Sequence, residues 1–143
     1  DASKYAGFTA PDAPVEPWIS VNPNHVEINA AEEFDDPDSV YTFYKKLIAM
    51  RHNSATISTG EWHLLAADSD QVYAFTRTNG DDTILVVVNL TDRSAALPSD
   101  VAELLSDGVN ESQVLLSTYD AMHSVKSIAR GELARWEGVV IQL

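Results

Sequence analysis

The sequence lacks cysteine, has only nine lysine and arginine residues, and contains no long apolar run. Without cysteine it has no disulfide, no thiolate metal ligand and no thiol nucleophile. The nine basic residues face 22 acidic ones, for a formal net charge of −13. This balance excludes the clustered positive charge that binds nucleic acids or anionic membranes. No apolar run approaches the roughly 18–20 residues that span a bilayer.

The chain begins at Asp1, with neither an initiator methionine nor the basic and apolar stretches of a signal peptide. We therefore expect a piece of a longer protein with a cytoplasmic location. Its 143 residues, 45% of them hydrophobic, have the size and composition of one globular domain. Charge is uneven along the chain. Residues 1–39 carry nine acidic and one basic residue, whereas residues 40–52 carry three basic residues and no acidic one.

The first 35 residues or so are rich in proline and show neither helical nor strand periodicity. Because each proline removes a donor and biases the preceding residue away from helix, we expect an irregular loop. The apolar residues in it predict that it packs over another surface; they include Phe8, Trp18, Ile19, Val21 and Ile28.

A helix follows, from Val40 to about Arg51. Its apolar residues recur at helical spacing and form one broad stripe: Val40, Phe43, Tyr44, Leu47 and Ile48. Asp36 is placed to cap the helix, with Pro37 in its first turn. A stripe this broad and aromatic predicts a large apolar partner.

From about residue 55 onward the pattern is one of short strands separated by turn residues, which predicts an antiparallel β-sandwich. The expected strands are 61–67, 71–78, 83–90, 95–97, 113–117 and 139–143, with weaker candidates at 125–129 and 133–136, and a helical turn at 101–105. Asn79-Gly80 indicates a hairpin. The continuously apolar run from Ile84 to Val88 is typical of a central strand covered on both faces.

Residues with catalytic potential are numerous but scattered. Most carboxylates lie in turns, and the four histidines have no metal-ligand spacing. No phosphate-binding glycine loop or G-x-S-x-G motif occurs. We therefore predict no cofactor and no metal site. Trp62 and Trp136 have two interpretations: they fill or cover the core, or they stack on sugar rings as in a carbohydrate-binding module. A purely structural or interaction domain is a third hypothesis.

Blocks of the sequence up to about residue 92 resemble the α-glucosidases of glycoside hydrolase family 13, of the oligo-1,6-glucosidase, dextran glucosidase and sucrose isomerase type. The N-terminal blocks are Asp1-Ala2-Ser3-Lys4-Tyr5-Ala6-Gly7-Phe8-Thr9, Pro17-Trp18, Val21-Asn22-Pro23-Asn24, Glu27-Ile28-Asn29, and Asp36 through Ile48 with Arg51. Tyr73-Ala74-Phe75-Thr76-Arg77 and Val86-Val87-Val88-Asn89-Leu90 look like the family's C-terminal β-domain.

The resemblance implies that residues 1–53 are the last loop and helix of a (β/α)8 catalytic barrel. Residues 54–143 would be its Greek-key C-terminal sandwich. The parent would hydrolyse terminal α-glucosidic bonds of short oligosaccharides with retention, and the barrel and the oligosaccharide would be the partners of this chain. The family's catalytic carboxylates match no residue here, so the chain alone would be inactive, with no catalytic residue of its own.

Within that frame, residues 1–8 form the only segment with an argued route to the substrate pocket, although no substrate-binding residue can be singled out. Without the barrel, we expect the first 35 residues to be partly disordered or two copies to cover the apolar stripe between them. The sequence leaves open the linkage (α-1,4 or α-1,6) and whether the reaction is hydrolysis or isomerisation.

Overall fold

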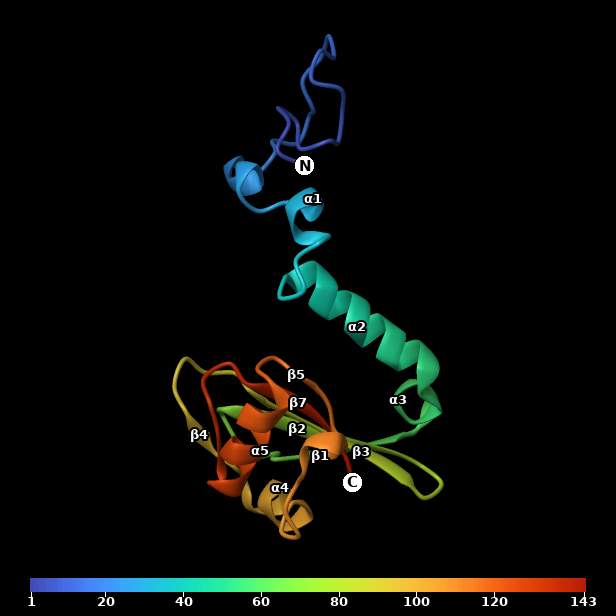
Figure 1. The fold of residues 1–143 in the computed structure, drawn as a ribbon, viewed down its shortest axis with the longest axis vertical. Coiled ribbons are helices and arrows are strands. Elements are labelled where there is room, and N and C mark those ends of the chain that lie inside the picture. Colours follow the sequence, from blue (N-terminus) through green and yellow to red (C-terminus); the bar gives the residue numbers. More distant parts are fainter. The chain divides into compact units, whose positions relative to one another are not determined.

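The computed structural model describes residues 1–143, which divide into two compact units, residues 1–50 and residues 51–143. Figure 1 shows the chain from its N-terminus to the last strand. No helix is long and apolar enough to cross a membrane.

The N-terminal unit is mostly turns, but it contains two short helices that the sequence analysis did not predict. They are the 3₁₀ helix η1 (Pro23–Val26) and α1 (Ala30–Glu33). Each begins with an asparagine whose side chain accepts backbone N–H bonds: Asn22 from Asn24, and Asn29 from Ala31 and Glu32. The expectation of an irregular segment is therefore correct for its turns and wrong where asparagine caps a single helical turn.

The predicted helix is present as α2 (Val40–Asn53). Its start differs from the prediction: Asp36 closes a preceding turn by accepting the Asp38 N–H at 2.9 Å, and the Ser39 hydroxyl accepts the Thr42 N–H at 3.1 Å. Ser39 therefore fills the capping position that the sequence assigned to Asp36. No residue of α2 is buried, and Val40, Tyr44 and Ile48 are each more than half exposed. The predicted apolar stripe thus exists and lacks the partner it needs.

Residues 51–143 form a β-unit whose antiparallel sheet confirms the predicted fold class. Five strands pair in the order β1-β2-β3-β7-β5, and two further strands, β4 and β6, pair separately. The strands are β1 (Glu61–Leu65), β2 (Val72–Asn79), β3 (Asp82–Asn89), β4 (Ala95–Ala96), β5 (Val114–Ser117), β6 (Glu132–Leu133) and β7 (Gly138–Gln142). The helical elements are α3 (Ala55–Thr59), α4 (Ser99–Leu104), η2 (Glu111–Gln113) and α5 (Ala121–Ala129).

The core of the β-unit lies on one face of the five-stranded sheet, which we call the inner face. Alternate strand residues enter it, among them Ala74, Leu85 and Val87, all completely buried. The opposing layer consists of α4, α5 and the β4–β6 pair, which contribute Val101, Leu105, Ile128, Ala95 and Leu133 to the same core. Figure 1 shows both helices on one side of the strands. The second layer of the sandwich is therefore mainly helical.

The predicted strand at 125–129 is wrong, because these residues form the second half of α5. Asp120 caps this helix by accepting the His123 N–H at 2.7 Å. Its buried residues Ser124, Ser127 and Ile128 recur at helical spacing. The predicted strand at 133–136 shrinks to β6, and the helical turn at 101–105 is α4.

The predicted hairpin joins β2 and β3. Asn79 pairs with Asp82, leaving a two-residue loop in which Gly80 has a φ of 61°. Type II′ hairpin turns place glycine at this first loop position, where other residues are strained.

Gly60 ends α3 where the chain meets β2, and it has no room for a side chain. A Cβ there would lie 2.4 Å from the Thr56 carbonyl oxygen and 2.9 Å from that of Thr78. We expect Gly60→Ala to lower the free energy of unfolding by about 1–3 kcal/mol, because backbone must shift to admit the methyl group.

The matched control is Gly138→Ala, whose added Cβ would meet its nearest neighbours at an ordinary 3.6 Å. We expect it to change stability by less than about 1 kcal/mol. Urea unfolding of both variants, followed by circular dichroism, measures the difference. Equal losses of unfolding free energy in the two variants would show that the close approach of the Thr56 and Thr78 carbonyl oxygens to Gly60 does not determine stability.

Candidate functional site

The turn formed by residues 1–8 is held by its own side chains. The Asp1 carboxylate accepts bonds from the Ser3 N–H (2.9 Å) and the Ser3 hydroxyl. Gly7, with a φ of 79°, lies so close to the Asp1 carboxylate that a Cβ added to Gly7 would be 2.9 Å from Asp1 Oδ2. A hydrogen bond with Tyr5 is the main effect that raises the pKa of the exposed Lys4 ammonium. The contacts of Asp1 therefore stabilise the turn itself.

His25 joins this turn to η1, a role that the sequence analysis missed. Its Nε2 is hydrogen-bonded to the Ser3 carbonyl oxygen at 2.9 Å and its Nδ1 to the Asn22 carbonyl oxygen at 2.8 Å. Neither contact involves a metal ligand or another acidic or basic side chain. The bridge spans 22 residues of sequence, so no local pattern could have indicated it.

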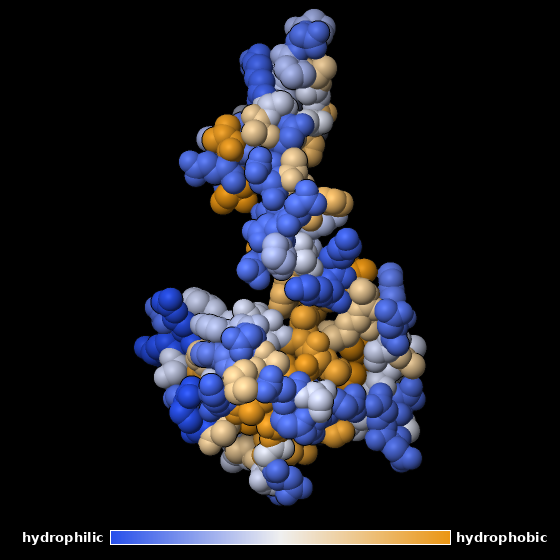
Figure 2. Space-filling view, in the orientation of Figure 1, coloured by the Kyte–Doolittle hydropathy of each residue, from blue (hydrophilic) through white to orange (hydrophobic).

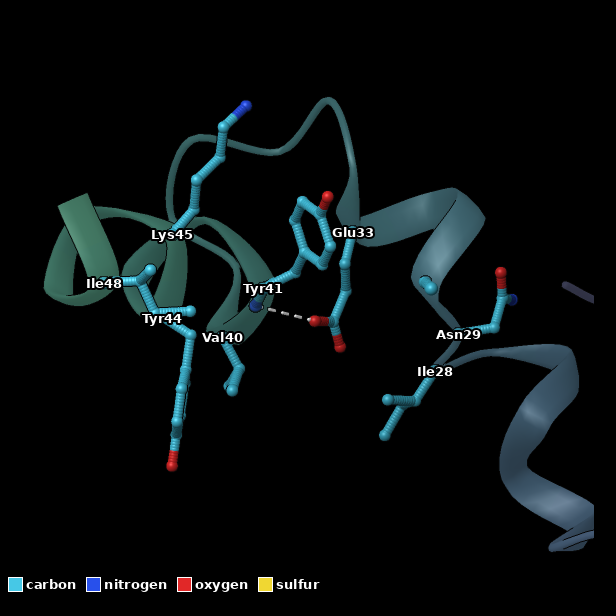
Figure 3. A pocket seen from close by; sticks show the side chains of 9 residues that line it. Ile28, Asn29, Glu33, Val40, Tyr41, Tyr44, Lys45 and Ile48 are labelled. Atoms are coloured by element: carbon cyan, nitrogen blue, oxygen red, sulfur yellow. Dashed lines mark hydrogen bonds between the residues drawn. The ribbon is translucent and has the colours of Figure 1, made fainter. Parts of the chain in front are cut away.

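An open groove of about 530 Å³ lies between α1 and the first half of α2. Figure 3 shows the side chains of Ile28, Val40 and Tyr44 pointing to the same side of the two helices. It is lined by Ile28, Asn29, Ala30, Glu33, Val40, Tyr41, Tyr44, Lys45 and Ile48. Three residues of the apolar stripe predicted from sequence, Val40, Tyr44 and Ile48, form part of its wall.

The polar groups of this groove do not form an acid–base pair of carboxylates. Glu33 accepts the Tyr41 N–H at 3.0 Å, the dashed contact in Figure 3, and the other ionisable groups are Tyr41, Tyr44 and Lys45. Retaining glycosidases use two carboxyl groups about 5–5.5 Å apart. The groove can bury an apolar partner, whereas its single carboxylate does not supply that chemistry.

Trp62 and Trp136 are both about half exposed, at 51% and 57%. They belong to different ends of the sheet. Trp62 lies in β1 in the cross-strand row that ends at Gln142 of β7, while Trp136 precedes the start of β7 at Gly138. Strand spacings place Gly138 about 20 Å from Trp62. The two indoles are therefore too far apart to stack on one sugar ring.

The β-unit contains a completely buried carboxylate, Glu137, which the sequence analysis did not single out. It accepts the Ser124 hydroxyl at 2.7 Å and the Ala134 N–H at 2.7 Å. The His123 imidazole lies nearby, with Nε2 3.9 Å from Glu137 Oε2 and without a hydrogen-bond partner. Burying a carboxylate costs free energy unless it is hydrogen-bonded, so these contacts decide whether this loop is stable.

No group of three or more His, Asp or Glu side chains converges as a metal site. Glu137 is not in an open pocket, and the Asp1 carboxylate is occupied by its own turn. The arrangement therefore consists of one apolar groove, one internal carboxylate and an N-terminal turn.

Family models match two consecutive stretches of the chain. Residues 1–60 match the α-amylase catalytic domain, and residues 62–107 match the maltogenic amylase C-terminal domain. The fold and these matches together place the chain in the α-amylase class of proteins.

The curated relatives of the chain belong to a narrower group within this class of proteins. The chain is 33% identical to oligo-1,6-glucosidase of Parageobacillus thermoglucosidasius, over 100% of its own length and 24% of the relative's. It is 36% identical to glucan 1,6-alpha-glucosidase of Streptococcus dysgalactiae, over 68% of its length and 18% of the relative's. A crystal structure of trehalulose synthase MutB from Pseudomonas mesoacidophila matches with a TM-score of 0.74 and 34% identity, over 99% of this chain and 24% of that one.

The chain belongs to the α-amylase family, glycoside hydrolase family 13, and corresponds to the C-terminal part of its α-glucosidases. It spans about a quarter of the length of the relatives matched over its whole length. The resemblance seen in the sequence up to about residue 92 is thereby confirmed, and the match to oligo-1,6-glucosidase continues beyond it over the whole chain.

Glu137→Gln tests the buried carboxylate. The amide is nearly isosteric, but it replaces one acceptor oxygen with an NH₂ group that faces a donor. We expect the free energy of unfolding to fall by about 1–3 kcal/mol. The control is Glu132→Gln, because Glu132 pairs with Arg130 at 3.2 Å on a largely exposed surface. Its loss should stay below about 1 kcal/mol. Similar losses of unfolding free energy for the two variants, measured by urea unfolding, would contradict a stabilising role for the buried Glu137 carboxylate.

Proposed function

We propose that this chain is the C-terminal part of an α-glucosidase that hydrolyses terminal α-glucosidic bonds of short oligosaccharides with retention. The observation that carries the proposal is the end-to-end match to oligo-1,6-glucosidases, at 33% identity over the whole chain. We also place the parent in the cytoplasm, which stays a prediction.

The names of the curated relatives favour α-1,6 linkages, since both oligo-1,6-glucosidase and glucan 1,6-alpha-glucosidase are named for that bond. Sucrose isomerisation is the second candidate. It is favoured by the likeness to MutB, a trehalulose synthase solved with the substrate sucrose. The residues that select between these reactions would lie in the three quarters of the relatives that this chain does not cover.

Within the parent, residues 1–53 would complete the catalytic barrel and residues 54–143 would form a stabilising β-domain. The packing of α3 supports this boundary: Arg77 of β2 donates from Nη2 to the Gly60 carbonyl oxygen at 2.7 Å and from Nε to that of Thr56 at 3.3 Å. The chain alone would be inactive, because its carboxylates supply no pair in an open cleft.

A carbohydrate-binding role for the β-unit is the alternative from another class. It is favoured by the exposed Trp62 and Trp136 and disfavoured by their separation, since a shared sugar platform needs both rings on one plane.

We expect the purified 143-residue chain to release no glucose from isomaltose, whereas the parent with its barrel does so. The coupled glucose assay measures both, with maltose as the substrate that tests linkage preference. Glucose release by the short chain would contradict the division of roles.

Without the barrel, we expect the chain to self-associate through the groove and the α2 stripe. Val40→Lys should shift the light-scattering mass toward the monomer, because a charge then lies on an apolar contact. Val15→Lys is the matched control, since Val15 is also exposed but does not line the groove. Self-association through the groove would be contradicted if the unsubstituted chain were a monomer at all concentrations. Equal shifts of the light-scattering mass in both variants would contradict it as well.

A further inference from the structure

His25 contacts carbonyl oxygens with both nitrogens of its ring. Nδ1 lies 2.8 Å from the Asn22 carbonyl oxygen, and Nε2 lies 2.9 Å from that of Ser3. A carbonyl oxygen only accepts hydrogen bonds, so each ring nitrogen must carry a proton to be bonded here. A neutral imidazole carries one such proton, whereas the imidazolium carries two. The complete bridge between η1 and the turn of residues 1–8 therefore requires the charged ring.

Both acceptor oxygens also bind a backbone donor, which holds them in place. The Ser3 carbonyl oxygen accepts the Ala6 N–H at 2.8 Å, and the Asn22 carbonyl oxygen accepts the His25 N–H at 3.1 Å. A neutral ring would therefore direct one nitrogen lone pair at an oxygen that cannot donate, at 2.8 or 2.9 Å. Loss of one ring proton thus removes one bond and leaves two acceptors facing each other.

The turn of residues 1–8 depends on this bridge, because little outside the turn holds it within this chain. Ser3 closes the turn with its own groups, since its hydroxyl accepts the Gly7 N–H at 3.2 Å. Ala6 has a φ of 55°, a left-handed conformation that residues with a side chain adopt only when their surroundings hold it. The His25 contact is the one hydrogen bond that the structure gives between residues 1–8 and the rest of the chain.

No carboxylate pairs with the His25 ring. The Asp1 carboxylate accepts its bonds from Ser3, and the ion pairs of the structure lie in the β-unit. The ring is therefore bound by two carbonyl oxygens alone. The other ionisable side chains of the segments around it are Asp1, Lys4 and Tyr5 on the turn, Glu16 near Lys4, Glu27 after η1, and Glu32 and Glu33 in α1.

The ring can exchange its proton with solvent. His25 is only partly buried, and Figure 2 shows hydrophilic residues over much of the surface near the N-terminus. Histidine ordinarily changes charge between about pH 5 and 8. The bridge is complete at the acidic end of this range, where the ring is charged. It loses one of its two bonds as the pH rises through the range.

We propose that His25 is a pH-dependent positioning residue: as the imidazolium it fixes the turn of residues 1–8 against η1, and loss of one ring proton releases the turn. The bridge itself does not depend on which reaction the parent catalyses. It bears on that reaction because residues 1–8 form the segment with an argued route to the substrate pocket, a step that rests on the proposed function.

Hydrogen exchange of the turn amides in the full-length parent tests the bridge. The N–H groups of Ala6, Gly7 and Phe8 are bonded within the turn, so their protection reports whether it is closed. Protection is the slowing of exchange relative to a free peptide at the same pH. We expect protection to be about tenfold lower at about pH 8 than at about pH 5.5, because one charge-assisted hydrogen bond is lost.

His25→Gln keeps one donor that does not titrate, so its turn protection should change by less than about twofold between the two pH values. His52→Gln is the matched control, because His52 is an exposed histidine at the end of α2 and should leave the tenfold change intact. Protection that is independent of pH in the unsubstituted parent would overturn the proposal, and this comparison needs no variant to fold. An unchanged pH dependence in His25→Gln would overturn it as well.

Glucose release from isomaltose tests the positioning role. Between about pH 6 and 8 we expect the KM of the unsubstituted parent to rise about threefold relative to that of His25→Gln, with a constant ratio of kcat values. Equal KM profiles in the two proteins would overturn the role in substrate binding. A parent that releases no glucose would refute the proposed function, whereas hydrogen exchange would still decide whether the bridge depends on pH.

Discussion

The sheet of the β-unit depends on a central strand, β3, that is apolar on both of its faces. Leu85 and Val87 are completely buried in the inner core, whereas Ile84, Val86 and Val88 face the other way. Each Å² of apolar surface removed from water stabilises the fold by about 25 cal/mol. The layer of α4, α5 and the short strands covers the inner face of β3. The apolar surface on its other face does not gain this stabilisation from that layer. On the opposite face of the sheet α3 packs, where Arg77 donates to the Thr56 carbonyl oxygen and Asp82 accepts the Thr56 hydroxyl.

Polar groups buried at one end of the same sheet fix the loops around it. The Asn89 side chain donates to the carbonyl oxygens of Arg93 and Ala134, at 2.7 and 2.8 Å, and accepts the Thr91 N–H at 3.0 Å. Glu137 closes the same region by accepting the Ala134 N–H. Both side chains are fully buried. A buried polar group costs stability when its partners are missing, so this network favours one loop arrangement over alternatives.

Features that depend on short-range periodicity were predictable from the sequence. The stripe of α2, the Gly80 hairpin and the apolar central strand β3 follow from residues a few positions apart, and the family follows from the blocks that resemble α-glucosidases. Features that depend on distant partners were missed: His25 bridges Ser3 and Asn22, and Glu137 meets Ser124 across 13 residues. The strand expected at residues 125–129 failed for a related reason. Its apolar residues suit strand or helix, and only the Asp120 cap and the buried serines of α5 decide.

The two units share one physical property, an apolar surface without a partner. In the N-terminal unit it is the groove beside α2, and in the β-unit it is the sheet face opposite the core, where Trp62, Leu64 and Tyr73 are exposed. Neither surface carries a pair of carboxylates positioned for glycoside hydrolysis, so neither is suited to that chemistry. Both instead have the composition of surfaces that another protein segment covers. The constraint that the two units share is therefore one of packing, because each surface keeps apolar area in contact with water until another segment covers it.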